Sequence, residues 1–95
     1  MNNLKIAFIG AGSRSFAGRT LVDVLLSEPL RAFDLELVLM DVIAEHIEHT
    51  AAFCRRAAEQ LKRPVTIRTT TKLDEAVAGA AFVVTRGDEL LVRTR

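Results

Sequence analysis

An apolar stretch that runs directly into a glycine turn is the feature that most constrains the fold of this chain. Every residue from Ile6 to Ile9 is apolar, as expected for a parallel strand that helices cover on both faces. Gly10 follows, where a residue without a Cβ makes a tight turn, and Gly12 lets the backbone approach a pyrophosphate at the start of a helix. The third position of this dinucleotide-binding pattern, usually Gly or Ala, is Ser15. The pattern predicts a strand, a phosphate-binding turn and a helix.

The rest of the chain alternates between strand-like and helix-like segments. Apart from the first strand, the expected strands are residues 35–40, 65–69 and 81–85, and the expected helices are about 13–27, 43–61 and 74–78. This βαβαβαβ order is that of the first mononucleotide-binding half of a Rossmann-like doubly wound parallel sheet, so the predicted fold class is α/β. We expect one domain over residues 1–95, with no second half of the sheet.

Periodicity and breakers define the expected helices. Pro29 stops the first helix, which should bury Phe16, Val24 and Leu25. Pro64 stops the second helix, and Gly79 is the expected C-cap of the third. The second helix has the clearest apolar face, with residues three or four apart at Ile43, Ile47, Ala51, Cys54, Ala58 and Leu61.

An acidic residue at the end of the second strand completes the nucleotide pattern. There, Asp41 would accept hydrogen bonds from the adenosine ribose, and its charge would repel the 2′-phosphate of NADP, which favours NAD. The predicted cofactor-binding residues are Gly10, Ala11, Gly12, Ser13, Arg14, Ser15, Phe16 and Asp41. The alternative is a turn that only connects a strand to a helix, with Asp41 capping the second helix and Arg14 at the surface.

Composition excludes several other classes. A net charge of +1 with scattered Lys and Arg residues argues against nucleic acid as a partner. Without a signal-like segment or a long apolar span, we expect a cytoplasmic protein that does not bind membranes. Cys54 lies on an apolar helix face and is expected to be a buried, inert thiol. His46 and His49 have a spacing that permits one shared metal, but a solvated face is the preferred interpretation, so no metal ligand is assigned.

Several segments together resemble the N-terminal region of glycoside hydrolase family 4. They are the Gly-x-Gly-Ser turn followed by Phe16, the Asp-x-Leu-Leu-x-x-Pro segment from Asp23 to Pro29, and the apolar strand from Ala80 to Val84. The resemblance implies an NAD-dependent glycosidase that also uses a divalent metal, typically manganese. It implies hydrolysis of an O-glycosidic bond by C3 oxidation, elimination, water addition and re-reduction. The family's catalytic and metal-binding residues lie downstream of the matched region, so we assign none here and expect the chain alone to be catalytically incomplete, with a glycoside as substrate only in a full-length parent.

The last residues depart from the family pattern. Where the family continues into a loop with paired glycines, this chain has only Gly87 followed by polar and basic residues, which suggests a truncated or altered terminus. Two other functions stay open: a fragment of an NAD-dependent lactate- or malate-type dehydrogenase, and a non-enzymatic half-domain that self-associates through an unpaired sheet edge. Whichever function holds, a homo-oligomer is expected.

Overall fold

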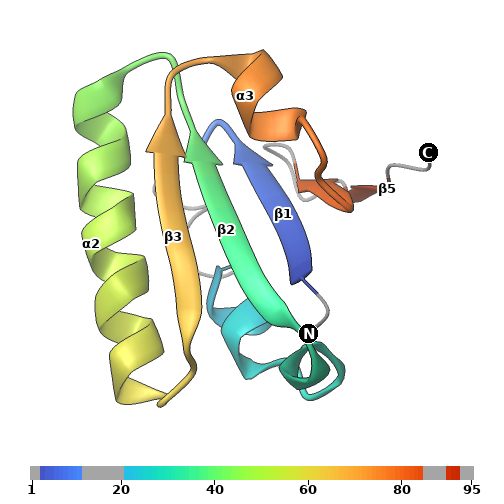
Figure 1. Cartoon of the computed structure of the whole chain (residues 1–95). Helices are drawn as coiled ribbons and strands as arrows, with labels where there is room; N and C mark the ends of the chain where they lie inside the picture. The colour runs from blue at the N-terminus through green and yellow to red at the C-terminus, as the bar shows by residue number, and fades with distance from the viewer. Residues whose placement is uncertain (1–2, 12–20, 85–89, 93–95) are drawn as a thin grey trace.

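One five-stranded sheet organises the computed structural model, which describes residues 3–11, 21–84 and 90–92 (Figure 1). The strand order is β3-β2-β1-β4-β5, and the strands β3, β2, β1 and β4 run parallel to one another. The strands are β1 (Asn3–Ile9), β2 (Asp34–Met40), β3 (Val65–Thr70), β4 (Phe82–Val84) and β5 (Leu90–Val92). The register of β1 against β2 aligns Ile9 with Met40, so both strands end at the same edge of the sheet.

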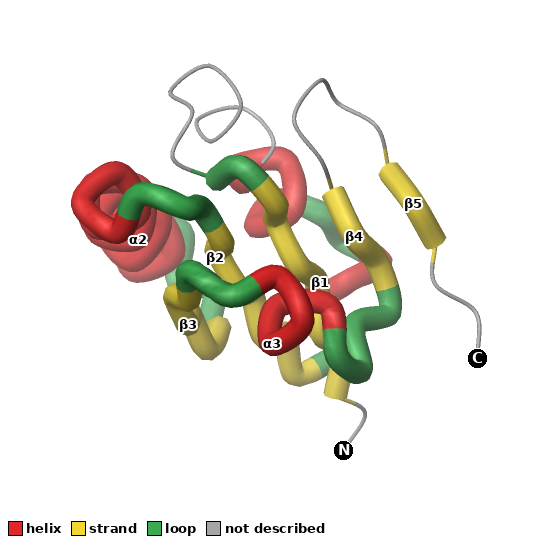
Figure 2. Tube along the Cα trace, turned by 90° about the horizontal axis from the view of Figure 1, so that it is seen from above, coloured by secondary structure: helices red, strands yellow, loops and turns green. Residues whose placement is uncertain are grey.

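Helices cover both faces of this sheet. Residues 21–26 and α2 (Ala44–Gln60) lie on one face, and the short α3 (Leu73–Val77) lies on the other, as Figure 2 shows from above. A short 3-10 helix, η1 (Pro29–Ala32), leads into β2. In the part of the chain that the structure describes, no helix is long and apolar enough to span a membrane.

The alternation of side chains along β1 separates two cores. Ile6 and Phe8 pack with the α2 residues Ile47 and Cys54 on one face. Ala7 points to the other face, where the second cluster also contains Val38, Met40, Ala76, Ala80 and Val83. The central strands are therefore buried on both faces, which accounts for their continuous apolar sequence.

These elements confirm the predicted α/β fold, the first half of a Rossmann fold, with differences at the boundaries. The link expected after Pro29 forms η1. Ile43 is not part of the buried stripe of α2: it is the N-cap of that helix and 44% exposed, because the helix begins one residue later. Ala78 is the C-cap of α3, and Gly79 follows it with φ of +72°.

The strand β5 is a second element, besides η1, that the sequence did not predict. It pairs antiparallel with β4, with Val83 opposite Leu91. The sequence gives no clear signal for this strand. Three apolar residues between polar and basic neighbours are too few to show a period of two. Of the first predicted helix, residues 21–26 are helical and Leu25 is buried, whereas Phe16 lies outside the described residues.

Candidate functional site

The glycine turn after β1 is described at Gly10 and Ala11, the first two predicted cofactor-binding residues. Gly10 has φ of +80°, a conformation that residues with a Cβ rarely adopt. The N–H groups of Gly10 and Ala11 both donate to the carbonyl oxygen of Met40, at 2.8 and 2.9 Å. The turn is thereby attached to the last residue of β2, and the Ala11 side chain is fully buried.

Asp41 follows Met40 directly and therefore lies beside this turn. Its own N–H donates to the carbonyl oxygen of Thr70 at 3.3 Å, which places it at the carboxyl edge between β1 and β3. Its Oδ1 accepts the N–H of Ile43 at 3.1 Å, and the residue is half-buried. The N-cap of α2 is Ile43 rather than Asp41, so Asp41 stabilises the turn before the helix without being its cap.

The structure thus brings Gly10, Ala11 and Asp41 together at the ends of two neighbouring parallel strands. In open α/β sheets, ligands bind outside the carboxyl ends of the strands, and here that edge carries a glycine turn and a carboxylate. The other predicted cofactor-binding residues, Gly12, Ser13, Arg14, Ser15 and Phe16, lie outside the described residues.

Thr50 is a residue of this site that the sequence prediction missed. It is 7% exposed in the middle of α2, and its hydroxyl donates to the carbonyl oxygen of Ala11 at 2.8 Å. A signal was present, because Thr50 is three residues after Ile47 and four before Cys54 and so belongs to the buried stripe of the helix. A polar residue on that stripe requires a partner, and the glycine turn supplies it.

Apolar side chains lie next to the carboxylate. Val42 is 78% exposed and Ile43 is 44% exposed, both in the segment between β2 and α2. Large apolar side chains with this much exposure, adjacent to a polar site, offer a contact surface to an aromatic or apolar ligand group.

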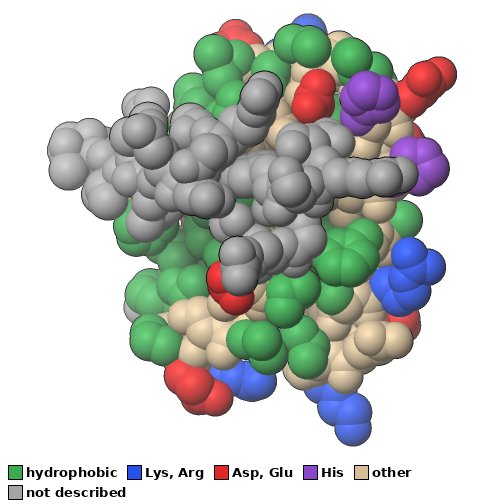
Figure 3. Space-filling model, turned by 180° about the vertical axis from the view of Figure 1, so that it is seen from behind, with side chains coloured by type: hydrophobic (Ala, Val, Ile, Leu, Met, Phe, Trp, Pro, Cys, Tyr) green, Lys and Arg blue, Asp and Glu red, His purple; other side chains and the backbone are tan. Residues whose placement is uncertain are grey.

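Potential metal ligands are dispersed. Cys54 is fully buried, and desolvation raises the pKa of its thiol to about 11, with the charge of Arg55 acting in the opposite direction. His46 and His49 are exposed on α2, as predicted for a solvated face, and Figure 3 shows the imidazoles (purple) at the surface. Within the described residues, no three His, Cys, Asp or Glu side chains are grouped so that they could hold a metal ion.

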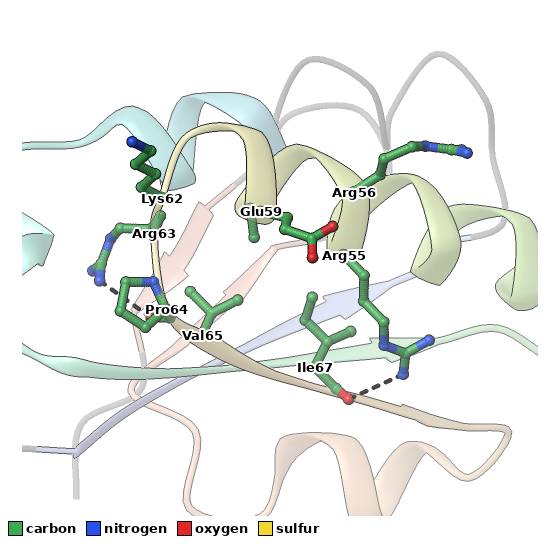
Figure 4. A pocket seen from close by; sticks show the side chains of 9 residues that line it. Arg55, Arg56, Glu59, Lys62, Arg63, Pro64, Val65 and Ile67 are labelled. Carbon is green, nitrogen blue, oxygen red and sulfur yellow. Dashed lines mark hydrogen bonds between the residues drawn. The ribbon is translucent and has the colours of Figure 1, made fainter.

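A pocket of about 640 Å³ lies elsewhere, along the outer side of β3 and the last turns of α2 (Figure 4). Four basic side chains and Glu59 surround it, over Val65 and Ile67. Arg55 donates to the carbonyl oxygen of Ile67 at 3.3 Å, and Arg63 donates to that of Leu30 at 2.7 Å. Because it begins at the amino end of β3, this pocket is separate from the glycine turn at the carboxyl ends of the strands.

The strand order and the turn between β1 and the helical segment define the class of this protein as the first half of a Rossmann fold. Residues 5–88 match the model of the family 4 glycosyl hydrolases. The chain therefore belongs to this family.

A curated relative and two solved structures are similar to the chain. An alpha-galactosidase of Rhizobium meliloti (strain 1021) is 31% identical over 84 residues, which cover 88% of this chain and 17% of that protein. A 6-phospho-alpha-glucosidase from gut microorganisms, in complex with NAD and glucose-6-phosphate, has a TM-score of 0.73 at 24% identity. The match covers 90% of this chain and 20% of the glucosidase. The Thermotoga maritima 6-phospho-beta glucosidase with NAD and glucose-6-phosphate has a TM-score of 0.70 at 22% identity. The match covers 90% of this chain and 19% of the glucosidase. This chain spans about a fifth of the length of these relatives.

Proposed function

We propose that this chain is the NAD-binding portion of an NAD- and divalent-metal-dependent glycosidase, and that by itself it does not turn over a substrate. The observation that carries the proposal is the direct attachment of the glycine turn to the end of β2, one residue before Asp41. Membership of the family and the two NAD complexes of its structural relatives support it.

In this proposal the described residues bind and orient the nucleotide. The backbone at Gly10 and Ala11 approaches the pyrophosphate, the carboxylate of Asp41 accepts hydrogen bonds from the adenosine ribose, and Val42 with Ile43 provides an apolar surface for the adenine ring. The negative charge of Asp41 disfavours the 2′-phosphate of NADP. The predicted residues Gly12, Ser13, Arg14, Ser15 and Phe16 would complete the phosphate contacts.

The glycine turn and the carboxylate of Asp41 fit a dinucleotide, whereas the described residues do not offer a group of ligands for a metal ion. The bound NAD would accept and return the hydride at C3 of a sugar. Because no group of three metal-binding side chains exists in the described part of the chain, we derive no metal-assisted step here, and we propose that the catalytic and metal-binding groups belong to the remainder of a full-length parent.

Family membership favours this function over a lactate- or malate-type dehydrogenase fragment, which the same half-sheet would also suit. Among the described residues, no strand pairs with the outer edge of β3, which supports a homo-oligomer as an additional proposal because unpaired strand edges associate.

Calorimetric titration of NAD and NADP into the chain tests the proposed function, with Asp41→Ala as the variant. We expect saturable NAD binding that is stronger than NADP binding, and a loss of about tenfold or more in NAD affinity when the carboxylate is removed, the size expected for hydrogen bonds to a charged group. The preference for NAD over NADP should also decrease in this variant, because the repulsion of the 2′-phosphate is lost.

The matched control is Asp34→Ala. Asp34 is an exposed residue at the opposite end of the same strand, so its removal should leave NAD binding unchanged. Absence of NAD binding by the unsubstituted chain, or equal weakening by both substitutions, would contradict the proposed site.

A further inference from the structure

The hydroxyl of Thr50 connects α2 to the glycine turn across 39 positions of the sequence. A Thr in a helix commonly donates to the carbonyl four residues earlier, and here that contact, to His46, is 3.4 Å long. The contact to the Ala11 carbonyl is 2.8 Å and buried. Since a hydroxyl has one proton to donate, the shorter distance indicates that the bond goes to the turn.

With this bond, three backbone groups of the turn have partners on neighbouring elements. The N–H groups of Gly10 and Ala11 donate to the end of β2, and the carbonyl of Ala11 accepts from α2. The described part of the turn is therefore held from two sides, by the end of β2 and by α2.

We propose that Thr50 is a positioning residue for the nucleotide pyrophosphate, whose hydroxyl holds the glycine turn in its binding conformation before the ligand arrives. This proposal rests on the proposed NAD-binding function. Its physical basis is that a turn ordered in advance does not have to be ordered during binding, so affinity increases without any contact between Thr50 and the ligand.

The test compares Thr50→Val, which keeps the shape of the side chain but removes the hydroxyl, with Thr50→Ser, which keeps the hydroxyl. Calorimetry with NAD should show binding about tenfold weaker for the Val variant and within about twofold of the unsubstituted chain for the Ser variant. Circular dichroism checks that both variants are folded, and Thr50→Ala serves as a second hydroxyl-free variant where Val does not fold.

Two probes separate positioning from a general structural effect. ADP carries a pyrophosphate and adenosine carries no phosphate, so NMR titrations of the Val variant should show weaker binding of ADP and unchanged binding of adenosine. Equal NAD affinity in the Val variant and the unsubstituted chain, or equal weakening with ADP and adenosine, would overturn the role of Thr50. Absence of NAD binding by the unsubstituted chain would instead overturn the proposed function, and the role of Thr50 with it.

Discussion

At the residue scale, burial decides the chemistry of the side chains on the apolar face of α2. Cys54 has no exposed surface, and desolvation raises the pKa of its thiol from 9.0 to about 11. The thiolate is the reactive form of cysteine, so a thiol with this pKa is inert at neutral pH. Thr50, four residues earlier, keeps its polar group buried only because the Ala11 carbonyl accepts its hydrogen bond.

The raised pKa of Cys54 predicts a loss of stability in alkaline solution. Because the folded chain holds the thiol proton more tightly than the unfolded chain, this contribution is fully present below pH 9 and is lost as the pH rises toward 11. In that range the free energy of unfolding should fall by up to about 1.4 kcal/mol per pH unit relative to Cys54→Ala, measured by urea denaturation. If the free energy of unfolding changes with pH in the same way for both proteins, the prediction is contradicted. The comparison is needed because lysines also titrate in this pH range, and they do so in both proteins.

At the element scale, the end of α2 shows how a helix stops where no glycine is available. Lys62 has φ of +55°, the N–H of Arg63 donates to the Ala58 carbonyl at 2.8 Å, and the N–H of Lys62 donates to the Glu59 carbonyl at 3.1 Å. This is the Schellman motif, with a lysine at the position where glycine is usual. Pro64 lies beyond the motif, so the turn itself ends the helix before the proline is reached.

The exposed Lys62 is therefore a site where a substitution should stabilise the fold. We expect Lys62→Gly to raise the free energy of unfolding by about 0.5–1 kcal/mol, because the strain of a left-handed residue with a Cβ exceeds the added flexibility of the unfolded chain. Thermal or urea denaturation measures this change in the free energy of unfolding. The matched control, Gln60→Gly inside the last helical turn, should destabilise by about 1 kcal/mol. Destabilisation by both substitutions would show that the Lys62 side chain contributes more than the backbone strain costs.

At the scale of the whole molecule, the outer edge of β3 is open in the part of the chain that the structure describes. The Thr70 carbonyl accepts the Asp41 N–H on the β2 side, and neighbouring residues of a parallel strand alternate in direction, so the backbone groups of Ile67 face outward. The Arg55 guanidinium donates to that outward carbonyl at 3.3 Å (Figure 4). Arg55 thus occupies an acceptor that another strand would need for pairing.

Removal of this side chain should increase self-association. We expect Arg55→Ala to strengthen association of the chain by about 0.5–1.5 kcal/mol, the net value of one hydrogen bond released for pairing, as measured by sedimentation velocity. Arg56→Ala is the control, because the adjacent side chain extends away from Ile67 in Figure 4 and its loss removes the same charge. An equal effect of both substitutions would assign the change to net charge rather than to the strand edge.

The order of the four parallel strands and their intervening helices, the α/β class and the position of the glycine turn could be predicted from the sequence alone. These follow from local properties: the apolar run of β1, the period of α2 and the permissive backbone of Gly10 are each visible within a few residues. The position of Asp41 at the end of the second strand was predicted in the same way, because it directly follows an apolar run.

Tertiary structure alone decided which distant groups meet. The bond between Thr50 and Ala11, the contact of Arg55 with the edge of β3 and the pairing of β5 with β4 all join segments whose proximity depends on how the helices and strands pack. The left-handed Lys62 was equally invisible in the sequence, because lysine carries no preference for that conformation. Local patterns specify the elements, whereas the partners of buried polar groups are chosen by packing, which brings together residues far apart along the chain.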